Sequence, residues 1–178
     1  TSIGNLWFKK DGKIIRNEIR PLVQELDELP YPDRDLQDMA LYIKRSGMVD
    51  VIAGRGCPYQ CTYCVEPTYQ QAFDGKGKFV RYRSVDSVLD EIEDLRRRFD
   101  FSSINFVDDV FTIDIRWLRE FAAKYKDRFG IPYTCNARIE AMREESYQLL
   151  KSSGCFSLEM GIESGSERIR KTVLNRKM

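Results

Sequence analysis

Three cysteines, Cys57, Cys61 and Cys64, stand close together in a C-x3-C-x2-C pattern. Thiolates are soft ligands that favour zinc or iron–sulfur clusters. A structural zinc site takes four ligands. The chain has no histidine, and Cys135 or Cys155 could be the fourth ligand only if the fold happened to bring one of them close. A [4Fe–4S] cluster held by the three close cysteines leaves one iron free to bind a small molecule. Such a cluster would have a chemical role rather than a structural one.

The lack of histidine also limits the chemistry that other residues can perform. It excludes a Ser-His-Asp triad and a Cys-His pair from these residues. The five cysteines are an odd number, whereas a disulfide framework favours an even number and a secreted context. We therefore expect a reduced, cytoplasmic protein whose clustered thiols bind metal.

From residue 48 onward, short apolar runs alternate with segments of helical periodicity. Ser84 and Asp114 precede two of these segments and are residue types that begin helices. Gly130 and Gly154 follow two of them and are typical of helix ends. The sequence predicts strands at 48–53, 103–107, 131–137 and 155–162, and helices at 84–99, 114–129, 143–152 and 166–174.

Repeated alternation of strand and helix indicates an α/β fold with parallel strands. A doubly wound sheet and a (βα) barrel both fit this pattern, and in both the loops after the strands build the active site. Polar residues gather in these predicted loops. They are Cys57, Cys61 and Cys64 after the first strand, Asp108 and Asp109 after the second, Asn136 and Arg138 around the end of the third, and Glu163 and Ser164 after the fourth.

The first 47 residues have a different character. Apolar residues on both sides of Asp11-Gly12 predict a β-hairpin, because Asp-Gly favours the positive φ angles of a two-residue turn. The prolines in residues 21–35 predict an extended connector, and we place a domain boundary near residue 48. Residues 65–83 are expected to form a long loop in which Arg81 and Arg83 are surface charges.

Composition narrows the class of partner. The 178 residues are 42% hydrophobic and 32% charged, which is typical of a globular protein. A net charge of +1 gives no electrostatic signal for nucleic acid or an acidic membrane. No apolar run has the ~20 residues of a membrane span, and the N-terminal residues lack the apolar region of a signal peptide. We expect neither a membrane nor a nucleic-acid partner.

The cysteine pattern, with Tyr63 before the last cysteine, resembles the signature of the radical S-adenosylmethionine (SAM) superfamily. The resemblance covers residues 48–178. It implies a partial (βα) TIM-like barrel of six strands, so that the four predicted βα units would be a core truncated at the C-terminus. It also implies that the open iron binds SAM, and that an electron from an external one-electron donor cleaves SAM to a 5′-deoxyadenosyl radical.

The same resemblance implies roles for the other loop residues, each with a plainer alternative. Asp108-Asp109 stands where the family often has Gly-Gly-Glu, so it matches only loosely; these carboxylates would bind the methionine ammonium, or form a turn and helix cap. Glu163 and Ser164 would contact the ribose and methionine, or form a turn. Asn136 and Arg138 would contact the methionine carboxylate or the substrate, and the alternative for Arg138 is an ordinary salt bridge. The backbone of Tyr63 would lie beside the adenine, and the alternative for Tyr63 is packing.

Residues 1–47 resemble the linker that follows a cobalamin-binding domain, through Leu6-Trp7-Phe8, Arg20-Pro21 and residues 29–34. This likeness implies an upstream cobalamin domain and methyl transfer to a small-molecule or peptide substrate. Two alternatives stay open. One is a methylthiotransferase, which would carry further cysteines upstream, and the other is a non-catalytic zinc-binding module.

Overall fold

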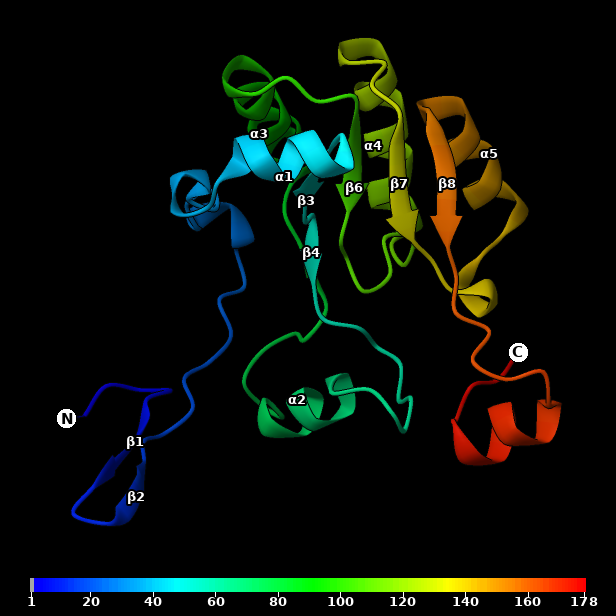
Figure 1. Ribbon diagram of the computed structural model, residues 1–178. Helices are drawn as coiled ribbons and strands as arrows, with labels where there is room; N and C mark the ends of the chain where they lie inside the picture. Colours follow the sequence, from blue (N-terminus) through cyan, green and yellow to red (C-terminus); the bar gives the residue numbers. More distant parts are fainter. Residues whose placement is uncertain (1) are drawn as a thin grey trace.

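The computed structural model describes residues 2–178 and centres on a four-stranded parallel sheet (Figure 1). The strand order, β3-β6-β7-β8, follows the order of the chain, as in a barrel, whereas a doubly wound sheet reverses direction at a switch point. The predicted α/β fold with parallel strands is confirmed. The strands are β3 (Met48–Val51), β6 (Ser103–Phe106), β7 (Tyr133–Asn136) and β8 (Cys155–Glu159).

Helices α3 (Val85–Arg98), α4 (Ile115–Arg128) and α5 (Glu144–Ser153) lie on one face of the sheet (Figure 1). Between α4 and the sheet, the rings of Phe106, Phe121 and Tyr133 are fully buried and meet edge to face, at centroid distances of 5.3 to 5.7 Å. This aromatic core fixes the sheet and therefore the positions from which the strand-end loops depart.

The helix starts predicted at Ser84 and Asp114 are confirmed. The Ser84 hydroxyl accepts a hydrogen bond from the Ser87 N–H, and the Asp114 carboxylate accepts from the N–H groups of Arg116 and Trp117. Each cap pairs N–H groups in the first helical turn, which have no partner within the helix.

The N-terminal segment contains the predicted hairpin and an unpredicted helix. Strands β1 (Trp7–Lys10) and β2 (Lys13–Arg16) pair antiparallel around Asp11-Gly12, whose φ angles are 49° and 78°. Figure 1 shows this hairpin projecting away from the sheet. The connector is not wholly extended, because it forms 3₁₀ turns at Leu26–Glu28 and Arg34–Leu36 and then α1 (Met39–Ser46), which starts at the capping Asp38 and ends at Gly47 with φ 71°.

The prediction of a long loop at residues 65–83 was wrong. The segment forms α2 (Glu66–Ala72), and β4 (Gly54–Arg55) pairs antiparallel with β5 (Arg81–Tyr82). The signal for α2 was Pro67, because the fixed φ of proline suits the first turn of a helix.

The prediction that Arg81 and Arg83 are surface charges was also wrong. Arg83 is buried and forms an ion pair with Glu91 of α3, which also pairs with Arg34 at 2.9 Å. The half-buried guanidinium of Arg81 has its pKa lowered by burial. A carboxylate on the buried face of α3 requires a positive partner, and Arg83 is that partner.

The remaining elements are a 3₁₀ turn at Ile139–Ala141 and a π-helical turn at Ile169–Val173, where a helix over 166–174 was expected. None of the helices that the structure describes has the length and apolar character needed to cross a membrane.

Candidate active site at the strand ends

The cysteine segment leaves the sheet through a sharp turn at Gly56. Its φ is 84°, and a Cβ atom there would lie 2.6 Å from the carbonyl oxygen of Phe79. Real Cβ atoms do not approach a backbone oxygen so closely, so only glycine fits this position without a shift. The turn directs Cys57 toward the carboxyl ends of the parallel strands.

Helix α2 holds the first half of the cysteine segment. The Cys57 N–H donates to Glu66 Oε2 at 2.9 Å. The side-chain amide of Gln70 donates to the carbonyl oxygens of Cys57, at 2.5 Å, and Tyr59, at 3.2 Å. These three bonds pair backbone groups of an irregular segment that has no strand partner there.

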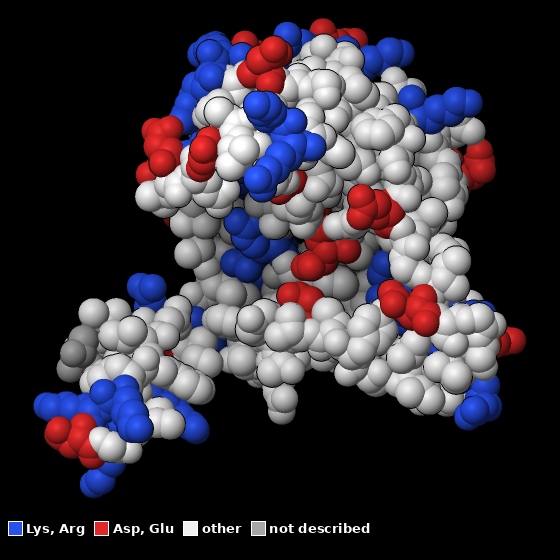
Figure 2. Space-filling view, viewed as in Figure 1, with Lys and Arg blue, Asp and Glu red and all other residues white. Residues whose placement is uncertain are grey.

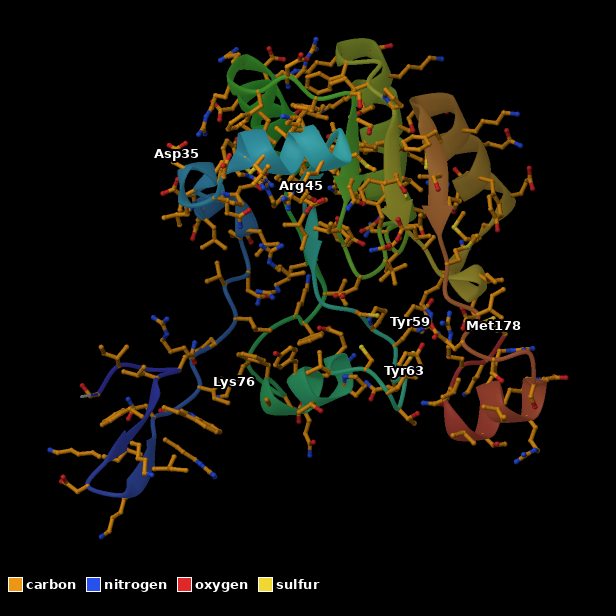
Figure 3. The ribbon with its side chains drawn as sticks, viewed as in Figure 1. Asp35, Arg45, Tyr59, Tyr63, Lys76 and Met178 are labelled. Carbon is orange, nitrogen blue, oxygen red and sulfur yellow. The ribbon has the colours of Figure 1, made fainter. Side chains whose placement is uncertain are left out.

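The C-terminal turn holds the second half. The Thr62 hydroxyl donates to the Val173 carbonyl at 2.7 Å, and the Thr62 N–H donates to the Leu174 carbonyl at 3.3 Å. The Asn175 amide donates to the Gln60 carbonyl at 2.8 Å. Figure 3 shows Tyr59 and Tyr63 of this segment on the side of the molecule that carries Met178. Hydrogen bonds between residues about a hundred positions apart in the sequence thus hold the cysteine segment against the C-terminal turn.

A cavity of about 460 Å³ opens between this segment and the strand ends. Figure 2 shows a hollow in this part of the surface in which acidic and basic side chains gather. Of the predicted residues, eight of ten line the cavity. The lining residues are Cys57, Tyr59, Cys61, Tyr63, Cys64, Glu66, Asp109, Val110, Asn136, Ala137, Arg138, Glu159, Met160, Gly161, Glu163 and Arg176.

The three cysteines share this one cavity. Cys57 and Cys61 are buried, and Cys64 is exposed. Burial raises the pKa of the Cys57 thiol. Two sulfurs already accept hydrogen bonds, Cys61 Sγ from Arg138 Nη1 at 2.8 Å and Cys64 Sγ from the Glu66 N–H at 3.5 Å. Hydrogen bonds to sulfur are a feature of iron–sulfur sites, so the donor set fits a cluster with three cysteine ligands.

The same side chains do not form a site for a single ion. Within residues 2–178, no three His, Cys, Asp or Glu side chains are grouped closely enough to hold one metal ion. A zinc site needs four ligands around one ion, whereas a cluster meets each cysteine through a separate iron.

A chain of charges runs along one wall of the cavity. Arg138 pairs with Glu140 at 2.7 Å, and Glu140 also meets Arg176 at 3.5 Å. Arg176 then pairs with Glu163 at 3.0 Å and donates to the Tyr63 hydroxyl at 3.2 Å. Arg138 and Arg176 are both buried, so the alternation of sign is what allows these charges to lie away from water.

The two neighbouring aspartates have different surroundings. Asp108 is buried and accepts from the N–H groups of Ala53 and Gly54, at 3.1 and 2.6 Å. Burial raises its pKa to about 6. Asp109 lines the cavity with Glu66, and burial raises the pKa of both carboxyls. Asp108 and Ser164 lie outside the set of described residues that line the cavity.

The other predicted residues are Asn136 and Glu163, which line the cavity, and Ser164, which does not. The Asn136 amide donates to the Asp108 carbonyl at 2.9 Å, which ties the ends of β6 and β7 together. Glu163 has a φ of 64°, a strained conformation for a residue with a side chain. The Ser164 hydroxyl accepts from the Ser166 N–H at 3.1 Å and so shapes the following turn.

The residues at or beside the site that were not predicted include Tyr59, Glu66, Glu140 and Arg176. Glu66 lies two positions after Cys64, and the start of a helix at Pro67 was a usable signal for it. Arg176 had no signal, because only the return of the C-terminal turn brings it to the cysteines.

Solved structures share this fold. Two structures of the radical S-adenosylmethionine methyltransferase TsrM from Kitasatospora setae match with a TM-score of 0.70, at 21% and 22% identity. They cover 95% of this chain, which covers 34% and 35% of theirs. One holds tryptophan and a SAM analogue, and the other holds cobalamin and a [4Fe–4S] cluster.

Curated relatives match most of the chain by sequence. An uncharacterised methyltransferase of Pyrococcus horikoshii is 32% identical over 92% of this chain and 35% of its own length. Cytidylyl-2-hydroxyethylphosphonate methyltransferase of Streptomyces wedmorensis is 25% identical over 97% of this chain and 37% of its own length. The chain thus spans about a third of these relatives. Residues 51–177 match the family described as the Radical SAM superfamily, which confirms the predicted resemblance: the chain belongs to the radical SAM superfamily.

Proposed function

We propose that the chain is the cluster- and SAM-binding part of a cobalamin-dependent radical SAM methyltransferase. The observation that carries this proposal is the common cavity of Cys57, Cys61 and Cys64 at the carboxyl ends of parallel strands. All the relatives described above bear the name methyltransferase, and one TsrM structure holds both cobalamin and a cluster. Methyl transfer is therefore the reaction class that the comparisons favour.

In this proposal Cys57, Cys61 and Cys64 would hold the cluster through three of its irons, and the fourth iron would be free to bind SAM. When bound, the cluster would supply the electron that cleaves one SAM molecule to methionine and a 5′-deoxyadenosyl radical, and a second SAM molecule would supply the methyl group that cobalamin carries, leaving S-adenosylhomocysteine. The electron comes from an external one-electron donor. The chain itself contributes binding, orientation and shielding from water, which are the tasks of a protein around such cofactors.

The charges of the lining residues suit different parts of SAM. Asp109 and Glu66 form an acidic side of the cavity that suits the methionine ammonium. Glu163 also lines the cavity, where its carboxylate suits the ribose hydroxyls, and Arg176 pairs with it at 3.0 Å. Asn136 and the backbone of Tyr63 border the same space and suit the methionine carboxylate and the adenine.

The substrate is proposed to be a small molecule. Names of relatives point to tryptophan and to a cytidylyl phosphonate, which share little chemistry. Such diversity fits a common SAM site combined with substrate contacts from other parts of each protein. The substrate of this protein therefore has to be found by experiment.

The test is anaerobic reconstitution of the protein with iron, sulfide and cobalamin, followed by reduction in the presence of SAM labelled in its methyl group. We expect a brown protein, 5′-deoxyadenosine as a product, and label transferred to cobalamin. Cys61→Ala removes one cluster ligand and should abolish all three results, whereas Cys155→Ala changes a cysteine outside the cavity lining and should retain them.

Two outcomes would contradict the proposal. A colourless protein with one bound zinc would support the metal-binding module instead. Formation of 5′-deoxyadenosine with sulfur inserted into a substrate would support a methylthiotransferase.

A further inference from the structure

Arg138 makes a direct contact with one of the three cysteine sulfurs. Its Nη1 donates to Cys61 Sγ at 2.8 Å, and the side chains come from segments 77 positions apart. Arg138 is 8% exposed and Cys61 is 5% exposed. Charge-assisted hydrogen bonds are stronger than neutral ones, and Coulomb interactions are stronger away from water. The contact is thus placed where it has a large effect on the charge of the sulfur.

The guanidinium is fixed from two other directions. Its Nη2 donates to Glu140 Oε1 at 2.7 Å, and its central carbon lies 3.9 Å from the centroid of the Tyr59 ring. A planar guanidinium that is paired at one edge and stacked on a ring has little freedom to rotate. Moving Arg138 away from Cys61 would break both of these contacts.

We propose that Arg138 raises the reduction potential of the cluster held by Cys57, Cys61 and Cys64. This inference rests on the proposed function, because it needs a cluster at this site. Reduction adds one electron to the cluster and forms or breaks no bond, so the group becomes more negative. A positive charge and an N–H donor at a ligand sulfur stabilise the more negative state more strongly, and such hydrogen bonds are known to set cluster potentials.

This role differs from the binding of a methionine carboxylate, which the resemblance implied for Arg138. Two edges of the guanidinium are already engaged, one by a sulfur and one by a carboxylate. The two roles make different predictions for the protein without SAM. Only the role in tuning changes the reduction potential in its absence.

The test is a redox titration with dithionite, monitored by the electron paramagnetic signal of the reduced cluster, on protein reconstituted without SAM. We expect Arg138→Met to make reduction at least tenfold less favourable, which is a shift of about 59 mV to more negative potential for one electron. Arg138→Lys keeps the charge and should give a smaller shift. Arg176→Met removes a buried positive charge from the same wall but no sulfur contact, so it should also give a smaller shift.

The outcomes separate this inference from the proposed function. If the unsubstituted protein binds no cluster, the proposed function fails. If it binds the cluster and Arg138→Met has the same potential, the tuning role is overturned. If the Arg138→Met protein binds no cluster, the same titration is made on Arg138→Gln, because glutamine is also neutral. Failure of both variants to load would overturn the tuning role and assign Arg138 to cluster assembly.

Discussion

The Thr62 hydroxyl donates a 2.7 Å hydrogen bond to the carbonyl oxygen of Val173, and this bond joins the cysteine segment to the C-terminal turn. We predict that Thr62→Val removes the bond and destabilises the docked turn by about 1 kcal/mol, the usual contribution of one such bond. Hydrogen exchange at the amides of residues 60–64 should become faster.

The matched control for this bond is Thr172→Val. The Thr172 hydroxyl donates at 2.6 Å to Arg168, within the same turn. The Thr172→Val variant loses a hydroxyl-to-carbonyl hydrogen bond without affecting the contact between Thr62 and Val173. Hydrogen exchange at the amides of residues 60–64 should therefore stay unchanged. Equal exchange in the two variants would show that the junction does not order the cysteine segment.

Gly56 gives a second prediction. Gly56→Ala introduces a Cβ at 2.6 Å from a backbone oxygen in addition to the strain of a positive φ. Gly75→Ala has the strain, with φ 68°, but nothing within 4 Å of the new Cβ. We expect Gly75→Ala to cost about 1–2 kcal/mol and Gly56→Ala to cost more and to lower the iron content after reconstitution. Urea unfolding and iron analysis measure both effects, and equal costs would contradict the close approach.

Asp108 predicts a pH dependence of stability. Burial raises its pKa in the folded protein from the ordinary 3.8 to about 6. The folded state therefore binds the proton of the Asp108 carboxyl more tightly than the unfolded state does. Protonation of Asp108 stabilises the folded protein at low pH, and this stabilisation is lost as pH rises from about 4 to about 6. The shift corresponds to about 3 kcal/mol.

The measurement is urea unfolding of the unsubstituted protein and of Asp108→Asn across this pH range. The variant cannot titrate at this position, so the difference between the two proteins should change between pH 4 and 6 and stay level above it. A difference that does not vary with pH would contradict the assigned pKa.

The buried ion pairs of Glu91 give a fourth prediction. Glu91→Ala leaves Arg34 and Arg83 without their carboxylate partner, so we expect a loss of about 3–5 kcal/mol. The control is Glu93→Ala on the same helix, which removes only ion pairs of 3.8 Å with more exposed partners and should cost about 0–1 kcal/mol. Thermal unfolding compares the two, and a small effect at Glu91 would contradict the role of this cluster.

The sequence predicted the parts of the fold and site that depend on local patterns. Apolar periodicity and capping residues located the parallel strands and α3 to α5, because these signals act within a few residues. Asp108 and Asp109 could not be told apart from the sequence, since they are adjacent and only the packing against Ala53 and Gly54 buries one of them. Arg176 could not be predicted, because its role depends on a contact with Tyr63 over 113 positions.

The most direct test of the central claim is Mössbauer spectroscopy of the protein reconstituted with ⁵⁷Fe and sulfide, before and after addition of SAM. The account predicts a cubane in which SAM changes the signal of one iron and leaves the other three unchanged, because Cys57, Cys61 and Cys64 supply the only three cysteines that line the cavity within the described residues. Four equivalent irons that do not respond to SAM, or a site that takes up zinc instead of iron, would contradict it.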